Sequence, residues 1–412
     1  MRVIRHNWML PLLLSAVLTA ATGDDWPQWR GPHRDGTSSS TSAPASWPEH
    51  LQLRWKLTVG EGHSSPILSA GRFFVFTRQQ DKEVASSIDL SSGKILWQES
   101  YPAPYKMNPA AESHGEGPKS TPVFYEGKLY TLGIAGILTC WDAATGRVQW
   151  RKDFSKQYRQ TSPLYGTAMS PVVDHGLLIA HVGGHDNGAL TAFDAGSGEV
   201  KWQWSGDGPA YASPIVADLG GARQVITETQ NNIVGVSAAT GQLLWQIPFS
   251  TEYVQNIPTP LLYGDLVIFS GLEKGVFAVH PAMKEGKWTA ETVWRNRDVS
   301  MYMSSPVLGG DLIFGFSHYK KGQIFCLDAH TGATRWTGPP RQGDNTAIVI
   351  SRENLILLKD GGELAIAKAA GQGFEPLRTY TVADSPTWAH PLVLRDGVVI
   401  KDAPTLAFWS VM

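Results

Sequence analysis

Ala192-Phe193-Asp194-Ala195-Gly196-Ser197-Gly198-Glu199-Val200-Lys201-Trp202 contains the pattern that decides the fold. An apolar run ends at an Asp, a turn containing Gly follows, and a Trp comes four residues after the second Gly. The Asp can accept hydrogen bonds from turn amides, and the Gly can adopt the positive φ that the turn requires. The flat Trp then falls on the next strand, where it can fill the wedge between two sheets. We therefore interpret the Asp as a turn cap and not as a catalytic group.

The same pattern recurs along the chain, and such recurrence is typical of a repeat fold. Clean copies place Asp, Gly and Trp in register at Asp89, Gly93 and Trp97, at Asp142, Gly146 and Trp150, and at Asp328, Gly332 and Trp336. Two weaker copies keep the frame with Ser237, Gly241 and Trp245, and with His280 and Trp294. We predict that one set of tryptophans docks the repeats against one another: Trp55, Trp97, Trp150, Trp202, Trp245, Trp294 and Trp336.

Prolines that open apolar strands give an independent count of the repeats. They are Pro66, Pro122, Pro171, Pro214, Pro260, Pro306 and Pro391. Residues 347–350 fill the gap between the last two, and Tyr380 stands near the position of a Trp. Each unit reads as four short strands separated by Gly-rich turns. We predict an all-β fold, an eight-bladed β-propeller of four-stranded antiparallel blades. Seven blades are the alternative if the unit after Trp336 is only an insertion.

The two ends of the repeat region fit a closed ring. The last unit, residues 391–409, lacks a fourth strand, whereas residues 51–57 with Trp55 resemble the fourth strand of the other units. Donation of this N-terminal strand to the last blade would close the ring and remove an exposed sheet edge. We therefore divide the chain into a signal peptide (1–23), an N-terminal extension (24–50) and a propeller (51–412).

The first residues are typical of an export signal. Arg2 and Arg5 precede an apolar run from Trp8 to Leu18, and small residues follow it. The run is short for a membrane span, and an uncleaved anchor is the alternative. No cysteine lies near it, so we expect a cleavable signal peptide and no lipid anchor. The mature protein is then periplasmic or secreted, with no transmembrane segment.

Composition and cysteine placement narrow the function classes. Charged residues make up 17% of the chain and the formal net charge is −2. The chain therefore lacks the excess of positive charge that favours nucleic-acid binding. Cys140 and Cys326 fall in the second and sixth units, on opposite sides of an eight-bladed ring. A disulfide requires Cα atoms within about 7 Å, so we expect both thiols to be free, buried and inert. No phosphate loop and no serine-hydrolase elbow is present.

Propellers gather ligands at the mouth of the central channel, where loops from all blades converge. The residues just before each opening Pro are therefore our ligand-binding candidates: His63, His114, Glu116, Lys119, Tyr211, Asn256, Tyr302, Asp344, Trp388 and His390. The same series includes Glu61, Ser64, Ser120, Tyr165, Met169, Gln255 and Asn345. We assign no catalytic residue. His181 and His185 lie in a hairpin loop, and we expect both at the surface.

Three interpretations of this channel mouth stay open. The first is a metal site of His63, His114 and His390, although no ligand-pair spacing supports it and we assign no metal. The second is an organic-ligand pocket in which Trp388 or a Tyr stacks and Lys119 contacts an anion. The third is a hydrated polar mouth without chemistry.

Residues 192–202 and 326–336 resemble the repeat of the pyrroloquinoline quinone (PQQ)-like propeller superfamily. Asp25-Trp26-Pro27-Gln28-Trp29-Arg30-Gly31-Pro32, followed by Asp35-Gly36, resembles the opening of exported bacterial members. The superfamily includes BamB and the quinoprotein alcohol dehydrogenases, so the resemblance is specific for fold and weak for activity. Those dehydrogenases carry a vicinal disulfide, Ca²⁺ ligands and a catalytic Asp. The two distant cysteines here exclude that disulfide, and we map none of the other groups onto this chain.

The strong repeat signal and the absence of catalytic signatures favour an exported, monomeric scaffold or binding propeller without catalytic activity, and we assign it no cofactor. It would present its channel-mouth loops to a protein or another envelope component. The alternative is a divergent oxidoreductase that uses PQQ and Ca²⁺ to act on alcohols or sugars. A carbohydrate-active propeller with a His and a carboxylate is a third hypothesis.

Overall fold

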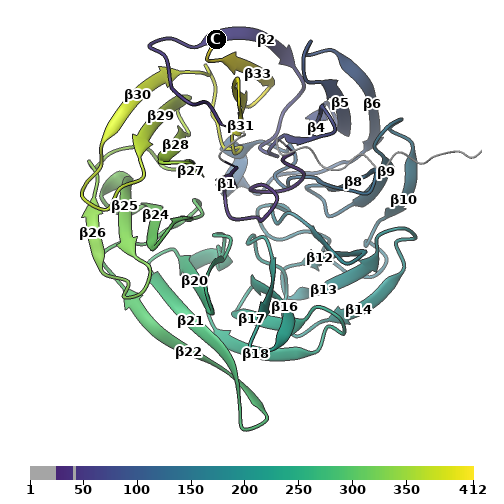
Figure 1. Ribbon diagram of the computed structural model, residues 1–412. Helices are drawn as coiled ribbons and strands as arrows, with labels where there is room; N and C mark the ends of the chain where they lie inside the picture. The colour runs from purple at the N-terminus through teal and green to yellow at the C-terminus, as the bar shows by residue number, and fades with distance from the viewer. Residues whose placement is uncertain (1–24, 40–42) are drawn as a thin grey trace, which may run out of the picture.

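Eight antiparallel sheets stand around a central axis and form a closed ring of blades (Figure 1). The computed structural model describes residues 25–39 and 43–412, so the predicted signal peptide lies outside the described residues. The eight-bladed prediction is confirmed, and the seven-bladed alternative is wrong because residues 346–381 form a complete sheet of their own.

In each blade the strands run from the channel outward in the order given. Blade one contains β3 (Ile67–Ser69), β4 (Arg72–Gln79), β5 (Lys82–Asp89) and β6 (Ile95–Pro102). Blade two contains β7 (Val123–Tyr125), β8 (Lys128–Leu132), β9 (Leu138–Asp142) and β10 (Val148–Lys152). Blade three contains β11 (Val172–Asp174), β12 (Leu177–Gly184), β13 (Asn187–Asp194) and β14 (Val200–Trp204). Blade four contains β15 (Ile215–Leu219), β16 (Ala222–Glu228), β17 (Asn232–Ser237) and β18 (Leu243–Pro248).

The second half of the ring follows the same order. Blade five contains β19 (Leu261–Tyr263), β20 (Leu266–Gly271), β21 (Gly275–Lys284) and β22 (Lys287–Asn296), of which the last two form a hairpin that projects beyond the ring (Figure 1). Blade six contains β23 (Val307–Gly309), β24 (Leu312–Ser317), β25 (Gln323–Asp328) and β26 (Thr334–Thr337). Blade seven contains β27 (Thr346–Ser351), β28 (Asn354–Lys359), β29 (Glu363–Lys368) and β30 (Pro376–Thr381). Short 3₁₀ helices are η1 (Pro109–His114), η2 (Glu252–Val254) and η3 (Tyr319–Lys321).

Blade eight joins the two ends of the propeller region. Its strands are β31 (Leu392–Leu394), β32 (Gly397–Lys401), β33 (Thr405–Ser410) and β2 (Gln52–Thr58). β2 pairs antiparallel with β33 and places Trp55 opposite Phe408. The predicted closure by the N-terminal strand is therefore confirmed, and it covers an edge that three strands alone would leave open.

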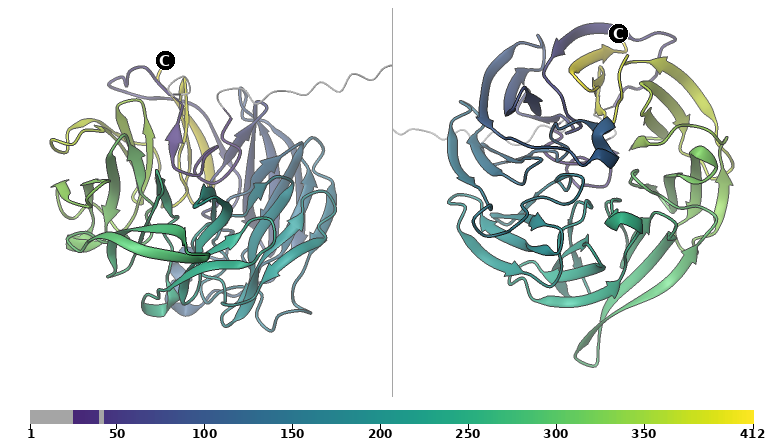
Figure 2. Two further views of the ribbon diagram at one scale, coloured as in Figure 1. Left: turned by 60° about the horizontal axis from the view of Figure 1, so that its bottom comes forward. Right: turned by 180° about the vertical axis from the view of Figure 1, so that it is seen from behind.

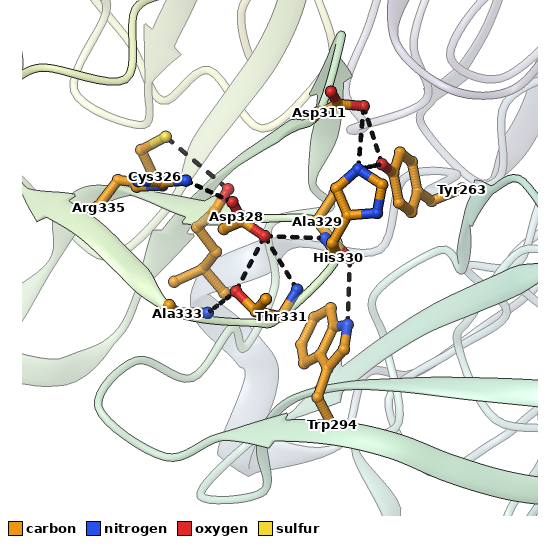
Figure 3. A network of polar contacts seen from close by, with 11 residues as sticks. Tyr263, Trp294, Asp311, Cys326, Asp328, Ala329, His330, Thr331, Ala333 and Arg335 are labelled. Carbon is orange, nitrogen blue, oxygen red and sulfur yellow. Dashed lines mark hydrogen bonds and ion pairs between the residues drawn. The ribbon is translucent and has the colours of Figure 1, made fainter.

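The Asp-Gly-Trp repeat joins neighbouring blades, as the contact between Trp294 and the turn of blade six shows (Figure 3). Trp294 Nε1 donates to the carbonyl oxygen of Ala329 at 3.1 Å. Asp328 Oδ1 accepts the amide of Thr331 at 2.9 Å and thereby holds the turn. Gly332 has a φ of +70°, and a Cβ there would lie 2.3 Å from the Trp294 ring. The ring can pack on the turn only because this residue is glycine.

Four more tryptophans make the same bond to the next blade. They are Trp97 to Ala143 O, Trp150 to Ala195 O, Trp202 to Ala238 O and Trp336 to Ala370 O. Trp245 differs, because its Nε1 donates to Gln224 Oε1 within its own blade at 2.7 Å. Trp55 packs on Gly93, and its Nε1 has no partner among the described residues.

Two predictions about single residues have different outcomes. Cys140 and Cys326 are free and fully buried, as the blade count requires. His181 is not at the surface: its side chain is 4% exposed and its Nε2 lies 3.1 Å from Asp207 O. That prediction was wrong because strands β12 and β13 extend to Gly184 and Asn187, which draws His181 into the sheet.

Candidate ligand-binding site at the channel mouth

A belt of hydroxyl groups ties the starts of the innermost strands around the channel. Before five of the innermost strands, a backbone N–H donates to a Ser or Thr hydroxyl of the neighbouring blade. The pairs are His390 to Ser65, Ser65 to Thr121, Thr121 to Ser170, Ser170 to Ser213, and Thr259 to Ser305, at 2.8–3.1 Å. The belt explains why small hydroxyl residues precede or adjoin the opening prolines, and it fixes the loops that surround the mouth.

Residues 25–38, which we call the plug, lie inside the ring. Trp26 bridges Leu68 of blade one, and β1 (Thr37–Ser38) runs parallel to β27 of blade seven (Figure 1). Trp29 Nε1 donates to Thr259 Oγ1 beside blade five at 2.8 Å. Arg34 Nη2 donates to Ser170 O beside blade three, also at 2.8 Å. The plug therefore crosses the channel and contacts blades on all sides.

A cavity of about 630 Å³ opens at the channel mouth. Trp29 of the plug lines it, and η1 contributes Ala110, Ala111 and His114. In the right-hand view of Figure 2 the blue turn of η1 lies close to the centre of the ring. Most of the remaining wall comes from the loops before the innermost strands, and Leu272 adds to it from the turn after β20. The cavity is therefore bounded by the plug, by η1 and by the hydroxyl belt.

Six of the predicted residues meet in this cavity. They are His63, His114, Lys119, Tyr211, Tyr302 and Trp388. The His114 and Trp388 rings lie edge to face with centroids 4.7 Å apart, and the His63 and His114 centroids are 6.0 Å apart. Tyr165, Gln255 and Asn345 of the wider series line it as well.

The other four predicted residues do not line the cavity. Asn256 is fully buried and holds its own loop, with its amide donating to Thr229 O at 2.7 Å. Glu116 lies 3.9 Å from Arg78. Asp344 is exposed, and His390 is buried edge to face against Trp29 with centroids 4.5 Å apart. The three histidines of the metal hypothesis do not converge, and the described residues contain no group of three His, Cys, Asp or Glu side chains suited to a metal ion.

Lys119 supplies the ammonium group of the cavity. Its Nζ donates to Tyr165 O at 2.8 Å, and burial lowers its pKa to about 8. Burial also lowers the pKa of His63 to about 3, and the charges of Lys401 and Lys119 act in the same direction. Burial and Lys119 lower the pKa of His114. Both imidazoles are therefore neutral at pH 7, and Lys119 is the cationic side chain of the lining.

Several lining residues were not predicted from the sequence. Trp29 is the most important, and Tyr253, Ile257, Leu272 and Met303 add further apolar surface. The aromatic opening motif at residues 25–32 contained the signal for Trp29, since it lies outside the repeat frame. Aromatic and apolar walls, one ammonium and no lining carboxylate suit a flat organic ligand that carries negative charge.

A family model described as "Outer membrane protein assembly factor BamB" matches residues 80–338, which is more than half of the chain. The chain belongs to the BamB family. BamB of Shewanella oneidensis is 25% identical over 239 residues, which are 53% of this chain and 56% of that protein. The chain thus spans little more than half the length of the curated BamB relatives that it matches. No helix among the described residues has the length and apolar character needed to cross a bilayer.

Other relatives of this BamB-family chain are enzymes. The dehydrogenase subunit of the quinone alcohol dehydrogenase of Komagataeibacter europaeus is 27% identical over 165 residues, 38% of this chain and 21% of that protein. Among solved structures, BamB of Moraxella catarrhalis has a TM-score of 0.64 at 13% identity, covering 88% of this chain and 98% of that one. Quinohemoprotein alcohol dehydrogenase of Comamonas testosteroni has a TM-score of 0.65 at 14% identity, covering 94% and 80%. At such identities the likeness shows the fold alone.

Proposed function

We propose that this chain is an exported, monomeric binding propeller of the cell envelope that carries out no chemistry of its own. The cavity at the channel mouth carries the proposal. Its volume of about 630 Å³ falls in the range of about 300–1,000 Å³ that is usual for organic-ligand pockets. It lies on the face where loops of many blades converge, so a partner docked there covers its opening. The family name supports an envelope setting for that partner.

The lining indicates the chemistry of the group that binds. Trp29 and Trp388 offer flat apolar surfaces on which a planar ring can stack. The Lys119 ammonium has three N–H donors, and Tyr165 O accepts one of them. A carboxylate beside an aromatic ring would satisfy both features. The pocket therefore suits an aromatic carboxylate, either free or carried by an envelope partner.

His63 is poorly suited to acid–base catalysis. A general acid or base works best with a pKa near the operating pH, whereas that of His63 is about 3. The lining also lacks a carboxylate that could act as proton acceptor or nucleophile. These features support binding without turnover.

The enzyme relatives raise a second candidate, a PQQ- and Ca²⁺-dependent oxidoreductase. Calcium takes six to eight oxygen ligands, several of them usually from Asp or Glu. The cavity lining contains no Asp or Glu, and its cationic group is Lys119. This donor set does not suit calcium, so we derive no reaction step through that cofactor. The buried, separate thiols of Cys140 and Cys326 also give no disulfide to cover a quinone.

Calorimetry and tryptophan fluorescence test the proposal with 1-naphthoate as the probe and neutral 1-naphthamide as its control. We expect saturable one-to-one binding of the acid and weaker binding of the amide. Lys119→Met should weaken binding of the acid about ten- to a hundredfold, because a charged hydrogen bond is lost. The exposed Lys106→Met serves as the matched control. Equal affinity for acid and amide would contradict the role of Lys119, and PQQ binding that requires Ca²⁺ would favour the oxidoreductase.

A further inference from the structure

Two arginines of the plug are buried in the channel without an ion-pair partner. Arg30 is 1% exposed and Arg34 is 3% exposed. Within the described part of the chain, neither forms an ion pair, whereas Arg78, Arg223 and Arg335 do. Buried charges are normally paired, because removal from water is costly. Two unpaired guanidinium groups on one short segment therefore require an explanation.

Hydrogen bonds to carbonyl groups satisfy only part of each guanidinium group. Arg30 Nη2 donates to the carbonyl oxygens of Asp35 and Pro306. Arg34 Nη1 donates to Pro171 O at 3.0 Å and to Gln28 Oε1 at 3.1 Å, and Arg34 Nη2 donates to Ser170 O at 2.8 Å. Three buried nitrogens remain without an acceptor among the described residues: Arg30 Nε, Arg30 Nη1 and Arg34 Nε. Carbonyl oxygens carry no net charge, so these bonds leave the positive charge uncompensated.

The two arginines and His390 share one environment. Burial and, in the same direction, the charge of Arg30 together lower the pKa of Arg34 to about 9. Burial lowers the pKa of His390 to about 3, again with the charge of Arg30 acting in the same direction. His390 Nδ1 is buried and has no partner in the described residues. Asp35 is the carboxylate whose field reaches Arg30, and its Oδ1 already accepts the amide of Thr37 at 2.8 Å.

We propose that Arg30 and Arg34 hold a buried chloride ion inside the channel, beneath Trp29. The ion neutralises the positive charge of the two guanidinium groups. It also accepts hydrogen bonds from their three N–H nitrogens that have no other acceptor among the described residues. The place is separate from the large cavity, because neither arginine nor His390 lines that cavity and Trp29 lies against His390. A monatomic anion is the smallest group that could accept the unpartnered N–H groups. Binding of the ion would hold the plug in the ring. The site is independent of the proposed ligand pocket.

The first test measures the melting temperature of the purified protein as chloride replaces gluconate at constant ionic strength. We expect the melting temperature to rise with chloride, by about 3 °C at one hundred times Kd. Arg34→Met should abolish the rise, and the exposed Arg54→Met should retain it. A melting temperature that is independent of chloride in the unmodified protein would overturn the proposal.

The second test needs no variant and remains decisive if Arg34→Met fails to fold. Crystals grown in sodium bromide should show an anomalous peak within hydrogen-bond reach of Arg30 and Arg34. Bromide confined to the outer surface would overturn the site. Loss of naphthoate binding at the mouth would leave this peak unchanged, so the two proposals fail separately.

Discussion

Trp29 Nε1 donates to Thr259 Oγ1 at 2.8 Å and joins residues that lie 230 positions apart in the chain. This bond anchors the plug to the start of blade five. It also places the Trp29 ring in the wall of the channel-mouth cavity, so that the same side chain anchors the plug and lines the pocket. The stability of the ring and the form of the site are thereby linked.

Removal of this acceptor should destabilise the protein modestly. Thr259→Val keeps the shape of the side chain and deletes the hydroxyl, so we expect a loss of about 1 kcal/mol in the free energy of unfolding. Thr379→Val on the exposed face of β30 is the control and should change it by less than about 0.5 kcal/mol. Urea unfolding measures both. Equal effects of the two substitutions would show that the bond contributes nothing.

The turn beneath Trp294 should be intolerant of a side chain. Gly332→Ala places a Cβ 2.3 Å from the ring at a φ of +70°, and the backbone strain alone costs about 1–2 kcal/mol. We therefore expect a total loss of more than about 2 kcal/mol. Gly361→Ala is the matched control, because no atom lies within 4 Å of its Cβ. Denaturant unfolding that gives the same stability for both variants would refute the docking role of this turn.

Acid should destabilise the protein partly through His181. Its pKa in the folded state is lowered to about 4 by burial, against about 6.5 when unfolded. The unfolded chain therefore binds the proton first, and stability falls by about 1.4 kcal/mol per pH unit as the pH drops from 6.5 to 4. His181→Gln should reduce this slope by one proton. Unfolding curves over this pH range test it, with exposed His50→Gln as the control, which should keep the full slope.

Binding of an aromatic carboxylate should weaken in alkaline solution. The pKa of Lys119 is about 8 in the free protein, so the ammonium form declines above that pH. We expect affinity to be highest below pH 8 and to fall up to about tenfold per pH unit above it. Calorimetric titration of 1-naphthoate between pH 6.5 and 9.5 measures this dependence. Affinity that stays constant to pH 9.5 would exclude Lys119 as the anion contact.

The amino-acid sequence by itself determined the architecture, because each copy of the repeat motif consists of residues that lie close together in the sequence. Asp328, Gly332 and Trp336 specify a turn and a docking ring within nine positions, and the same triplet marks other blades. Tyr380 shows how far the pattern extends: it stands on β30 of a complete blade although it is not a Trp, and its hydroxyl donates to Pro48 O. The orphan strand at residues 51–57 likewise predicted the closure of the ring.

Sequence alone placed only part of the site. The rule that residues before the innermost strands face the mouth located His63, Lys119 and Trp388, because those loops have equivalent positions in every blade. It did not separate them from Asn256, whose amide turns back into its own loop. The position in the repeat determines where a loop lies. Whether a side chain of that loop points into the cavity or bonds to the loop itself depends on the hydrogen-bond partners nearby.

The tertiary structure decided what fills the channel. The sequence of residues 25–38 does not predict that they cross the ring. Their hydrogen-bond partners Thr259, Ser170 and Pro306 lie far away in the sequence. Only closure of eight blades brings these partners around one axis. The burial of Arg30 and Arg34, the position of Trp29 in the cavity wall and the low pKa of His390 all arise from that closure, since burial is a property of the assembled ring.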